Sequence, residues 1–183
     1  LTLMRKLSLS VKYLIKIRKS SKPGGRDMTR KFCLISLILI MIVLAGPPHQ
    51  VVADVLNRFY IHGVPYIKQA DPYWCGPASL SMVLGYWGYE INQSEVAAHV
   101  YDPDSKLTYI SNMTTFPREL GFKSEPLISA SIERLKEYIE EGIPLIVLQK
   151  LSYENPYGHF RIVVGYDEEK RIIITDDPWF GEN

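Results

Sequence analysis

The chain has 183 residues, of which 46% are apolar and 22% are charged, with 12 Gly and 12 Pro. This composition excludes a collagen, a low-complexity disordered chain and a polytopic membrane protein, and the length fits one domain of ordinary size. The charge is divided unevenly: residues 1–53 carry ten Lys or Arg and one acid, whereas residues 54–183 carry eleven Lys or Arg and nineteen acids. An acidic domain has no electrostatic reason to follow a phosphate backbone, so we expect no nucleic-acid partner.

The basic piece has the order of a secretory signal. Met-Thr-Arg-Lys from Met28 is followed by an apolar stretch over residues 32–45 and by Val-Val-Ala, which ends at Ala53. A charged start, an apolar centre and a small-residue exit are typical of a signal peptide. Fourteen residues form a helix of about 21 Å, which is shorter than the ~30 Å hydrocarbon core of a bilayer. We therefore expect residues 28–53 to be a signal peptide cleaved after Ala53, with a membrane anchor through residues 32–45 as the alternative.

We interpret residues 1–27 as a basic upstream segment that precedes the true start at Met28, with a basic membrane-surface segment as the alternative. The exported part is then one domain over residues 54–183, secreted or held at the cell surface. Its C-terminal end is expected to be truncated, since the chain stops just after an apolar turn.

Helical patterns dominate the first half of this domain. Residues 59–67 come first and alternate as a strand does. Pro77 suits the first turn of a helix that begins at Cys75 and ends at Gly85 or Gly88. Further helices are predicted by an Asn-x-x-Glu capping box before residues 96–100, by residues 116–120, and by a Ser-capped amphipathic pattern over residues 132–139.

Strand patterns dominate the second half. Residues 144–149 are a short apolar run typical of a buried strand. Residues 159–166 and 171–175 flank a polar turn, which predicts a β-hairpin. The fold class is therefore α+β, with a helical N-terminal half packed on an antiparallel sheet from the C-terminal half.

The register of this hairpin brings a carboxylate to a histidine. With the turn centred near residues 168–169, the numbers of opposed residues sum to roughly 336–338, so that His159 faces positions 177–179. Asp176 and Asp177 lie at this end of the hairpin. The sequence therefore predicts that one of these two carboxylates lies beside His159.

The cysteine count directs attention to one thiol. Cys33 lies in the expected signal, so the exported part keeps only Cys75. That excludes an intramolecular disulfide and a metal site built on paired cysteines. The histidines of the domain lie far apart without helical spacing, and we expect neither a metal nor another cofactor. A lone cysteine is either a buried apolar filler or a functional thiol.

The predicted elements supply each part of a thiol-based acyl-transfer site. A cysteine at a helix N-terminus has its thiolate stabilised by the macrodipole, and a neighbouring protonated histidine stabilises it further. A carboxylate behind His159 would orient the ring and stabilise the imidazolium. Donors for a developing oxyanion are available from a backbone N–H near Cys75 and from the side-chain amide of Gln69, six residues earlier.

These residues stand in a set of motifs that resembles a known family. In chain order they are Val-Pro-Tyr at 64–66 with Gln69, Trp-Cys-Gly-Pro-Ala-Ser at 74–79, Gly-Ile-Pro at 142–144, Gly-His-Phe at 158–160 with Val-Val-Gly-Tyr at 163–166, and Asp-Pro at 177–178. The set resembles the papain-like, bacteriocin-processing cysteine peptidases of family thirty-nine, and more closely their stand-alone peptidase-like branch. The resemblance covers about residues 60–180.

The resemblance implies a papain-like fold and a role for each matching residue. Cys75 matches the nucleophile, His159 the general base and acid, and Gln69 the oxyanion-hole glutamine. Asp177 matches the carboxylate that orients the histidine, with Asp176 as the alternative. Members that trim double-glycine leaders usually have Asp directly before the cysteine, where this chain has Trp74, so the resemblance does not extend to that specificity.

We therefore expect a cysteine peptidase that hydrolyses a peptide or amide bond in a peptide or protein substrate through a thioester acyl-enzyme. Two other functions remain open on the same fold. One is a non-catalytic peptide-binding module, and the other is a transpeptidase that passes the acyl group to an amine.

Overall fold

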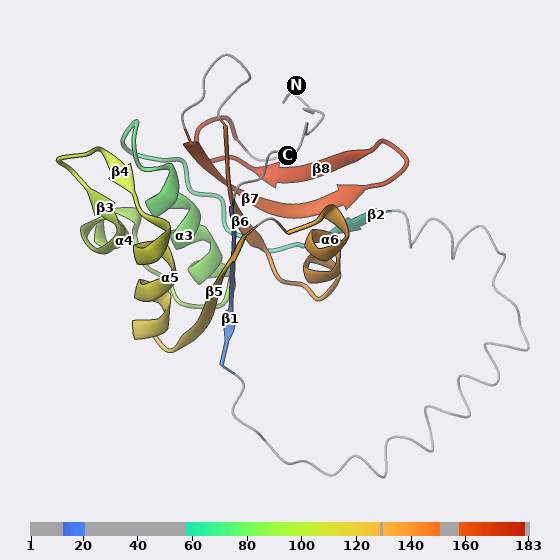
Figure 1. Ribbon diagram of the computed structural model, residues 1–183, viewed down its shortest axis with the longest axis horizontal. Helices are drawn as coiled ribbons and strands as arrows, with labels where there is room; N and C mark the ends of the chain where they lie inside the picture. The colour runs from blue at the N-terminus through green and yellow to red at the C-terminus, as the bar shows by residue number, and fades with distance from the viewer. Residues whose placement is uncertain (1–12, 21–57, 129, 151–157, 182–183) are drawn as a thin grey trace, which may run out of the picture.

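The computed structural model describes residues 13–20, 58–128, 130–150 and 158–181 (Figure 1). They form a six-stranded antiparallel sheet, a two-stranded sheet and four helices. The helices are α3 (Cys75–Tyr86), α4 (Gln93–Val100), α5 (Ile110–Glu119) and α6 (Ile132–Glu140). The strands are β1 (Tyr13–Lys19), β2 (Arg58–Tyr60), β3 (Tyr101–Asp102), β4 (Leu107–Thr108), β5 (Phe122–Ile128), β6 (Leu145–Lys150), β7 (Gly158–Asp167) and β8 (Ile172–Asp176). The α+β class predicted from the sequence is confirmed.

The large sheet is covered by helices on both faces. Its strand order is β2-β7-β6-β1-β5. The sixth strand, β8, is outside this order and also pairs with β7. In Figure 1, α3, α4 and α5 lie on one side of the sheet and α6 on the other. Because successive side chains of a strand point to opposite faces, Ile146 and Ile162 share a hydrophobic cluster with α3, whereas Leu145 and Val163 share a second cluster with α6.

The helix α3 is the buried centre of the larger cluster and begins at Cys75, as the sequence predicts. Pro77 occupies its first turn, where a missing N–H leaves no bond unmade, and every residue from 76 to 84 is buried. A Cβ added at Gly76 would lie 2.5 Å from Cγ2 of Thr108, so only glycine fits there without a shift. The packing of this first turn therefore fixes the position of Cys75.

Two of the other helices also begin at their predicted caps. The side chain of Asn92 accepts a hydrogen bond from the backbone N–H of Glu95 at 2.9 Å, and Ser131 accepts one from Arg134 at 3.2 Å. The predicted helix 116–120 is in fact longer, since α5 starts at Ile110 and tolerates Pro117 in its interior. The predicted extended segment 59–67 is a regular strand only in β2; the rest has no regular structure.

At the end of the hairpin nearest His159, β7 and β8 have the register that the sequence predicts. Ile162 pairs with Asp176 and Val163 with Thr175, so that the paired numbers sum to 338. A register shift lies between Val163 and Gly165, so the numbers of the paired residues nearer the turn sum to 339. The strand β8 ends at Asp176, and the next residue, Asp177, forms an isolated bridge with Gly181.

The expectation that residues 1–27 take no part in the fold is wrong for residues 13–19. They form β1, which lies between β5 and β6 and pairs with both in antiparallel fashion. Leu14, Ile15 and Ile17 are at most 1% exposed. The sheet therefore includes a strand from well before residue 54, where we expected the domain to begin.

The strand β1 was not predicted because of its basic residues. Lys16 is paired directly with Glu125 of β5, and its Nζ lies 3.0 Å from Oε2 of that residue. Arg18 and Lys19 are exposed at the end of the strand. The alternation of apolar and basic residues that looked like a targeting segment is the period-two pattern of a strand with a buried face.

The expected signal peptide or anchor at residues 28–53, including the apolar stretch 32–45, lies outside the described residues. Among the helices that the structure describes, none is long and apolar enough to cross a membrane.

The place of β1 can be tested by truncating one of its buried side chains. We expect Ile17→Ala to lower the free energy of unfolding by about 2–5 kcal/mol, because it leaves a cavity in the core. Urea denaturation of the full chain measures this change. Ile128→Ala is the matched control, since Ile128 is 71% exposed and its truncation should change stability by less than about 0.5 kcal/mol. Equal stability of the Ile17→Ala variant and the wild type would contradict the placement of β1.

Candidate active site

Cys75 is the first residue of α3, and its side chain is partly exposed. The N-terminus of a helix carries a partial positive charge and unpaired N–H groups, both of which favour a thiolate there. The first turn of α3 contains no acidic residue that would offset this effect. Cys75 therefore stands at the positive end of α3.

His159 is the second residue of β7 and is 6% exposed. Its Nε2 lies 2.9 Å from Oδ1 of Asp177, and its side chain also interacts with Cys75. Because Nε2 faces the carboxylate, Nδ1 is the ring nitrogen left for the sulfur. Burial by itself would lower the pKa of His159, but the interactions with Asp177 and Cys75 outweigh it and raise the pKa above its ordinary value.

The turn after β8 presents the Asp177 carboxylate to His159. The backbone N–H and C=O of Asp177 exchange hydrogen bonds with Gly181 at 3.0 and 2.9 Å. Oδ1 also accepts from the backbone N–H groups of Trp179 at 2.8 Å and Phe180 at 3.1 Å. Burial tends to raise the pKa of Asp177, but the hydrogen bonds and positive charges of His159 and Arg161 lower it to about 2. Asp177 is therefore a carboxylate at neutral pH.

Asp176, the alternative partner of His159, ends β8 and is also buried. The hydrogen bond to the ring of His159 comes from Asp177. The contact to His159 is therefore made by Asp177, the residue that follows β8.

Gln69 lies in the segment before α3 and is buried at 7% exposure. Its backbone N–H donates to the carbonyl of Pro178 at 3.0 Å, which ties it to the segment after Asp177. Its Nε2 donates to the carbonyl of Asp71 at 2.8 Å. The same carbonyl accepts from the backbone N–H of Trp74 at 3.1 Å. Asp71 thus links the amide of Gln69 to the residue that precedes Cys75.

Arg161 is a member of the site that the sequence analysis did not single out. It is 7% exposed, and its Nε donates to Oδ2 of Asp177. It stands two residues after His159 on β7, so both side chains leave the same face of the strand. This two-residue spacing is visible in the sequence. Nothing in the sequence, however, identifies Asp177 as the partner of a charged residue between Phe160 and Ile162.

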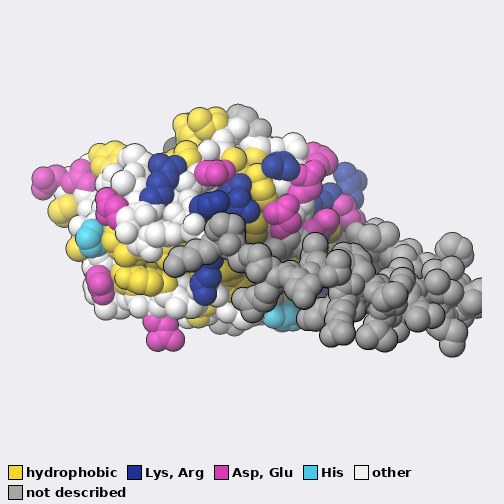
Figure 2. Space-filling view, turned by 90° about the horizontal axis from the view of Figure 1, so that it is seen from below, with side chains coloured by type: hydrophobic (Ala, Val, Ile, Leu, Met, Phe, Trp, Pro, Cys, Tyr) yellow, Lys and Arg dark blue, Asp and Glu magenta, His cyan; other side chains and the backbone are white. Residues whose placement is uncertain are grey.

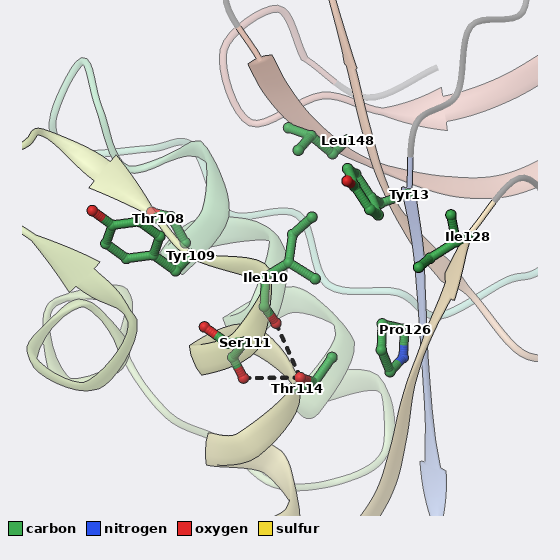
Figure 3. A pocket seen from close by; sticks show the side chains of 9 residues that line it. All are labelled: Tyr13, Thr108, Tyr109, Ile110, Ser111, Thr114, Pro126, Ile128 and Leu148. Carbon is green, nitrogen blue, oxygen red and sulfur yellow. Dashed lines mark hydrogen bonds between the residues drawn. The ribbon is translucent and has the colours of Figure 1, made fainter.

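Two cavities of the described structure share no lining residue, and one of them is lined by Gln69. The first has a volume of about 410 Å³ and is lined by Tyr13, Thr108, Tyr109, Ile110, Ser111, Thr114, Pro126, Ile128 and Leu148 (Figure 3). The second has a volume of about 390 Å³ and is lined by Lys68, Gln69, Ala70, Asp71, Pro72 and Trp179.

Two side chains of the first cavity lie beside glycines that are adjacent in sequence to Cys75 and His159. Thr108 occupies the space beside Gly76, which follows Cys75, and Leu148 occupies the space beside Gly158, which precedes His159. The second cavity reaches the site through Gln69. In the described part of the chain, no group of three or more His, Cys, Asp or Glu side chains could hold a metal ion.

The buried carboxylate predicts a pH-dependent contribution to stability. Because the folded pKa of Asp177 is about 2, below the usual ~3.9 of an unfolded aspartate, its contribution is present above about pH 4 and is lost as the pH falls toward 2. We expect Asp177→Asn to lower the free energy of unfolding at pH 7 by about 2 kcal/mol. Urea denaturation at pH 7, 4 and 3 should show this difference shrinking with acidity.

The exposed Asp104 is the control for this measurement. Asp104→Asn should change stability by less than about 0.5 kcal/mol at every pH. A difference between Asp177→Asn and wild type that stays constant from pH 7 to pH 3 would contradict an ionised Asp177 held by its partners.

One comparison with known proteins identifies the family of the chain. The sequence profile of the Peptidase_C39 like family matches residues 61–183. That range contains Gln69, Cys75, His159 and Asp177. No curated protein and no solved structure matches the chain. The family match covers more than half of the chain and agrees with the resemblance of the motifs, and the chain belongs to the Peptidase_C39 like family.

Proposed function

We propose that the protein is a cysteine peptidase that hydrolyses peptide or amide bonds with Cys75 as nucleophile. One observation carries this proposal: the buried ring of His159 is hydrogen-bonded to the carboxylate of Asp177 and interacts with Cys75 at the start of α3. A cysteine that merely filled the core would need neither a helix N-terminus nor an imidazole beside it. Family membership supports a peptidase-type fold.

In the proposed reaction, the proton of the Cys75 thiol resides on His159, and the thiolate attacks the carbonyl carbon of the substrate. The negative charge that develops on the carbonyl oxygen is stabilised by N–H donors. The imidazolium of His159 then gives its proton to the leaving amine, which departs and leaves a thioester on Cys75. His159 next removes a proton from water, the hydroxide attacks the thioester, and the acid leaves while the thiol is restored.

Gln69 is the proposed side-chain donor for this oxyanion. Its Nε2 carries two hydrogens, and one of them donates to the carbonyl of Asp71. That bond holds the amide, while the second hydrogen can donate to a substrate oxygen. The backbone N–H at Cys75, at the start of α3, is the proposed second donor.

The two cavities are the proposed places for the substrate on either side of the scissile bond. The first presents no charged side chain and is lined by apolar groups such as Leu148 and Ile110, so we propose that it takes an apolar side chain of the acyl part. The second carries Lys68 and Asp71, which have opposite charges. Figure 2 shows a similar mixture of both charges, with hydrophobic side chains between them, on one face of the molecule.

The nucleophile can be tested without knowing the substrate. In a Cys33→Ser background, where Cys75 is the only thiol of the chain, we expect iodoacetamide to alkylate the native protein at pH 6 much faster than the urea-unfolded protein. The reason is that an ordinary thiol with a pKa near 8.5 is almost fully protonated at pH 6. Equal rates in native and unfolded protein would contradict an activated thiolate.

Turnover can be tested on a library of fluorogenic peptides. We expect Cys75→Ala to abolish cleavage, and His159→Ala to lower kcat about 10²–10⁴-fold. Gln69→Ala should lower kcat about 10²–10³-fold and leave the rate of alkylation at Cys75 unchanged, because it acts on the oxyanion and not on the thiol. Circular dichroism verifies that each variant is folded. A fully active His159→Ala variant would rule out the mechanism.

The two other functions give different products in the same assay. A transpeptidase would add the mass of an amine supplied in excess to the acyl fragment, whereas a hydrolase adds water. A non-catalytic module would bind peptides equally well before and after Cys75→Ala and would form no thioester detectable by mass spectrometry.

A further inference from the structure

Arg161 places a positive charge inside the protein where the strand around it is apolar. Phe160, Ile162 and Val163 are all buried hydrophobic neighbours on β7. Arg161 is the only buried Lys or Arg in the described part of the chain. A buried charge is strongly unfavourable unless it is paired and hydrogen-bonded. Its partner is Asp177, and this pairing requires a reason beyond packing.

The contacts of Asp177 show what Arg161 adds. Oδ1 accepts from His159 and from the backbone N–H groups of Trp179 and Phe180. Oδ2 accepts from Nε of Arg161. Because each oxygen has its own donors, the carboxylate has little freedom to rotate about its bond to Cβ. Arg161 thereby keeps Oδ1 on the side of the imidazole.

We propose that Arg161 is a positioning residue of the Cys75–His159 pair, which acts by fixing the Asp177 carboxylate through Oδ2 and by balancing its negative charge. This inference rests on the proposed function. Arg161 itself touches neither the sulfur nor the imidazole in any contact that the structure shows. Its effect on the reaction passes through Asp177.

The positive charge of Arg161 affects the protonation of neighbouring groups in a definite direction. The titratable and charged groups of the described residues that interact with His159 or Asp177 are Cys75 from α3, Arg161 from β7 and the Tyr66 hydroxyl, which donates to the Asp177 carbonyl at 3.3 Å. Removing the one permanent positive charge from this group makes protonation of His159 and of Cys75 more favourable. The pH range in which the thiolate and imidazolium coexist should therefore move upward.

The experiment measures the rate of Cys75 alkylation by iodoacetamide from pH 4 to pH 10 in the full chain with Cys33→Ser. We expect Arg161→Met and Arg161→Gln each to move the whole pH profile upward by on the order of one pH unit, because each removes a positive charge near the titrating groups. Arg161→Lys keeps the charge but not the planar fork. Its profile should stay at the wild-type pH while its maximal rate falls at least about threefold.

Arg58→Met is the matched control. Nε of Arg58 lies 3.8 Å from Oδ2 of Asp167, a buried carboxylate at the far end of β7. The same substitution there should leave both the position and the height of the profile unchanged. A role of Arg161 in folding alone would lower the folded fraction without moving the profile.

The outcomes separate this inference from the proposed function. If wild-type Cys75 reacts at pH 6 no faster than an unfolded thiol, the proposed function fails and the inference with it. If the wild type shows the activated profile and a folded neutral variant of Arg161 follows the same curve, only the inference is overturned. Should neither neutral variant fold, an Arg161→Lys variant with the wild-type maximal rate overturns it equally.

Discussion

The hydrogen bond between His159 and Asp177 depends on the pairing of β7 with β8, and the rest of the site depends on that bond. The ring is held by a carboxylate that receives four donors from the same hairpin and the turn after it. Gln69 is tied to the same turn through the carbonyl of Pro178. A shift of one residue in the pairing of β7 with β8 would separate His159 from Asp177 and displace the turn that carries both the carboxylate and the anchor of Gln69.

The Cys75 thiol comes from the helix α3, whereas His159 and Asp177 come from the sheet and the turn after it. α3 packs on the sheet through Ile146, Ile162 and their neighbours, and its first turn is fixed by the close contact between Gly76 and Thr108. Nucleophile and base thus come from two rigid elements that meet at one edge of their interface, rather than from mobile loops. A site built in this way has its geometry set by the core, which is suited to chemistry that requires a fixed distance between two side chains.

Much of this could be predicted from the sequence, and the part that could not has a common cause. The start of α3 follows from Pro77, and the proximity of His159 to Asp177 follows from the register of the hairpin. Both are local patterns in the sequence. Arg161 and β1 were missed because each becomes meaningful only through a distant partner. Arg161 needs Asp177, and Lys16 needs Glu125. Read alone, a basic residue suggests solvent or a membrane surface, and only the pairing partner shows that it belongs inside a sheet.

The place of β1 also constrains the biology of the segment that follows it. Residues 13–19 and residues 58–60 belong to one sheet. Removal of a leader by a cut after Ala53 would make β1 a separate peptide. It would be retained by its backbone pairing with β5 and β6, by the burial of three aliphatic side chains, by the ion pair of Lys16 with Glu125 and by the hydrogen bond from Trp87 to the carbonyl of Ile17.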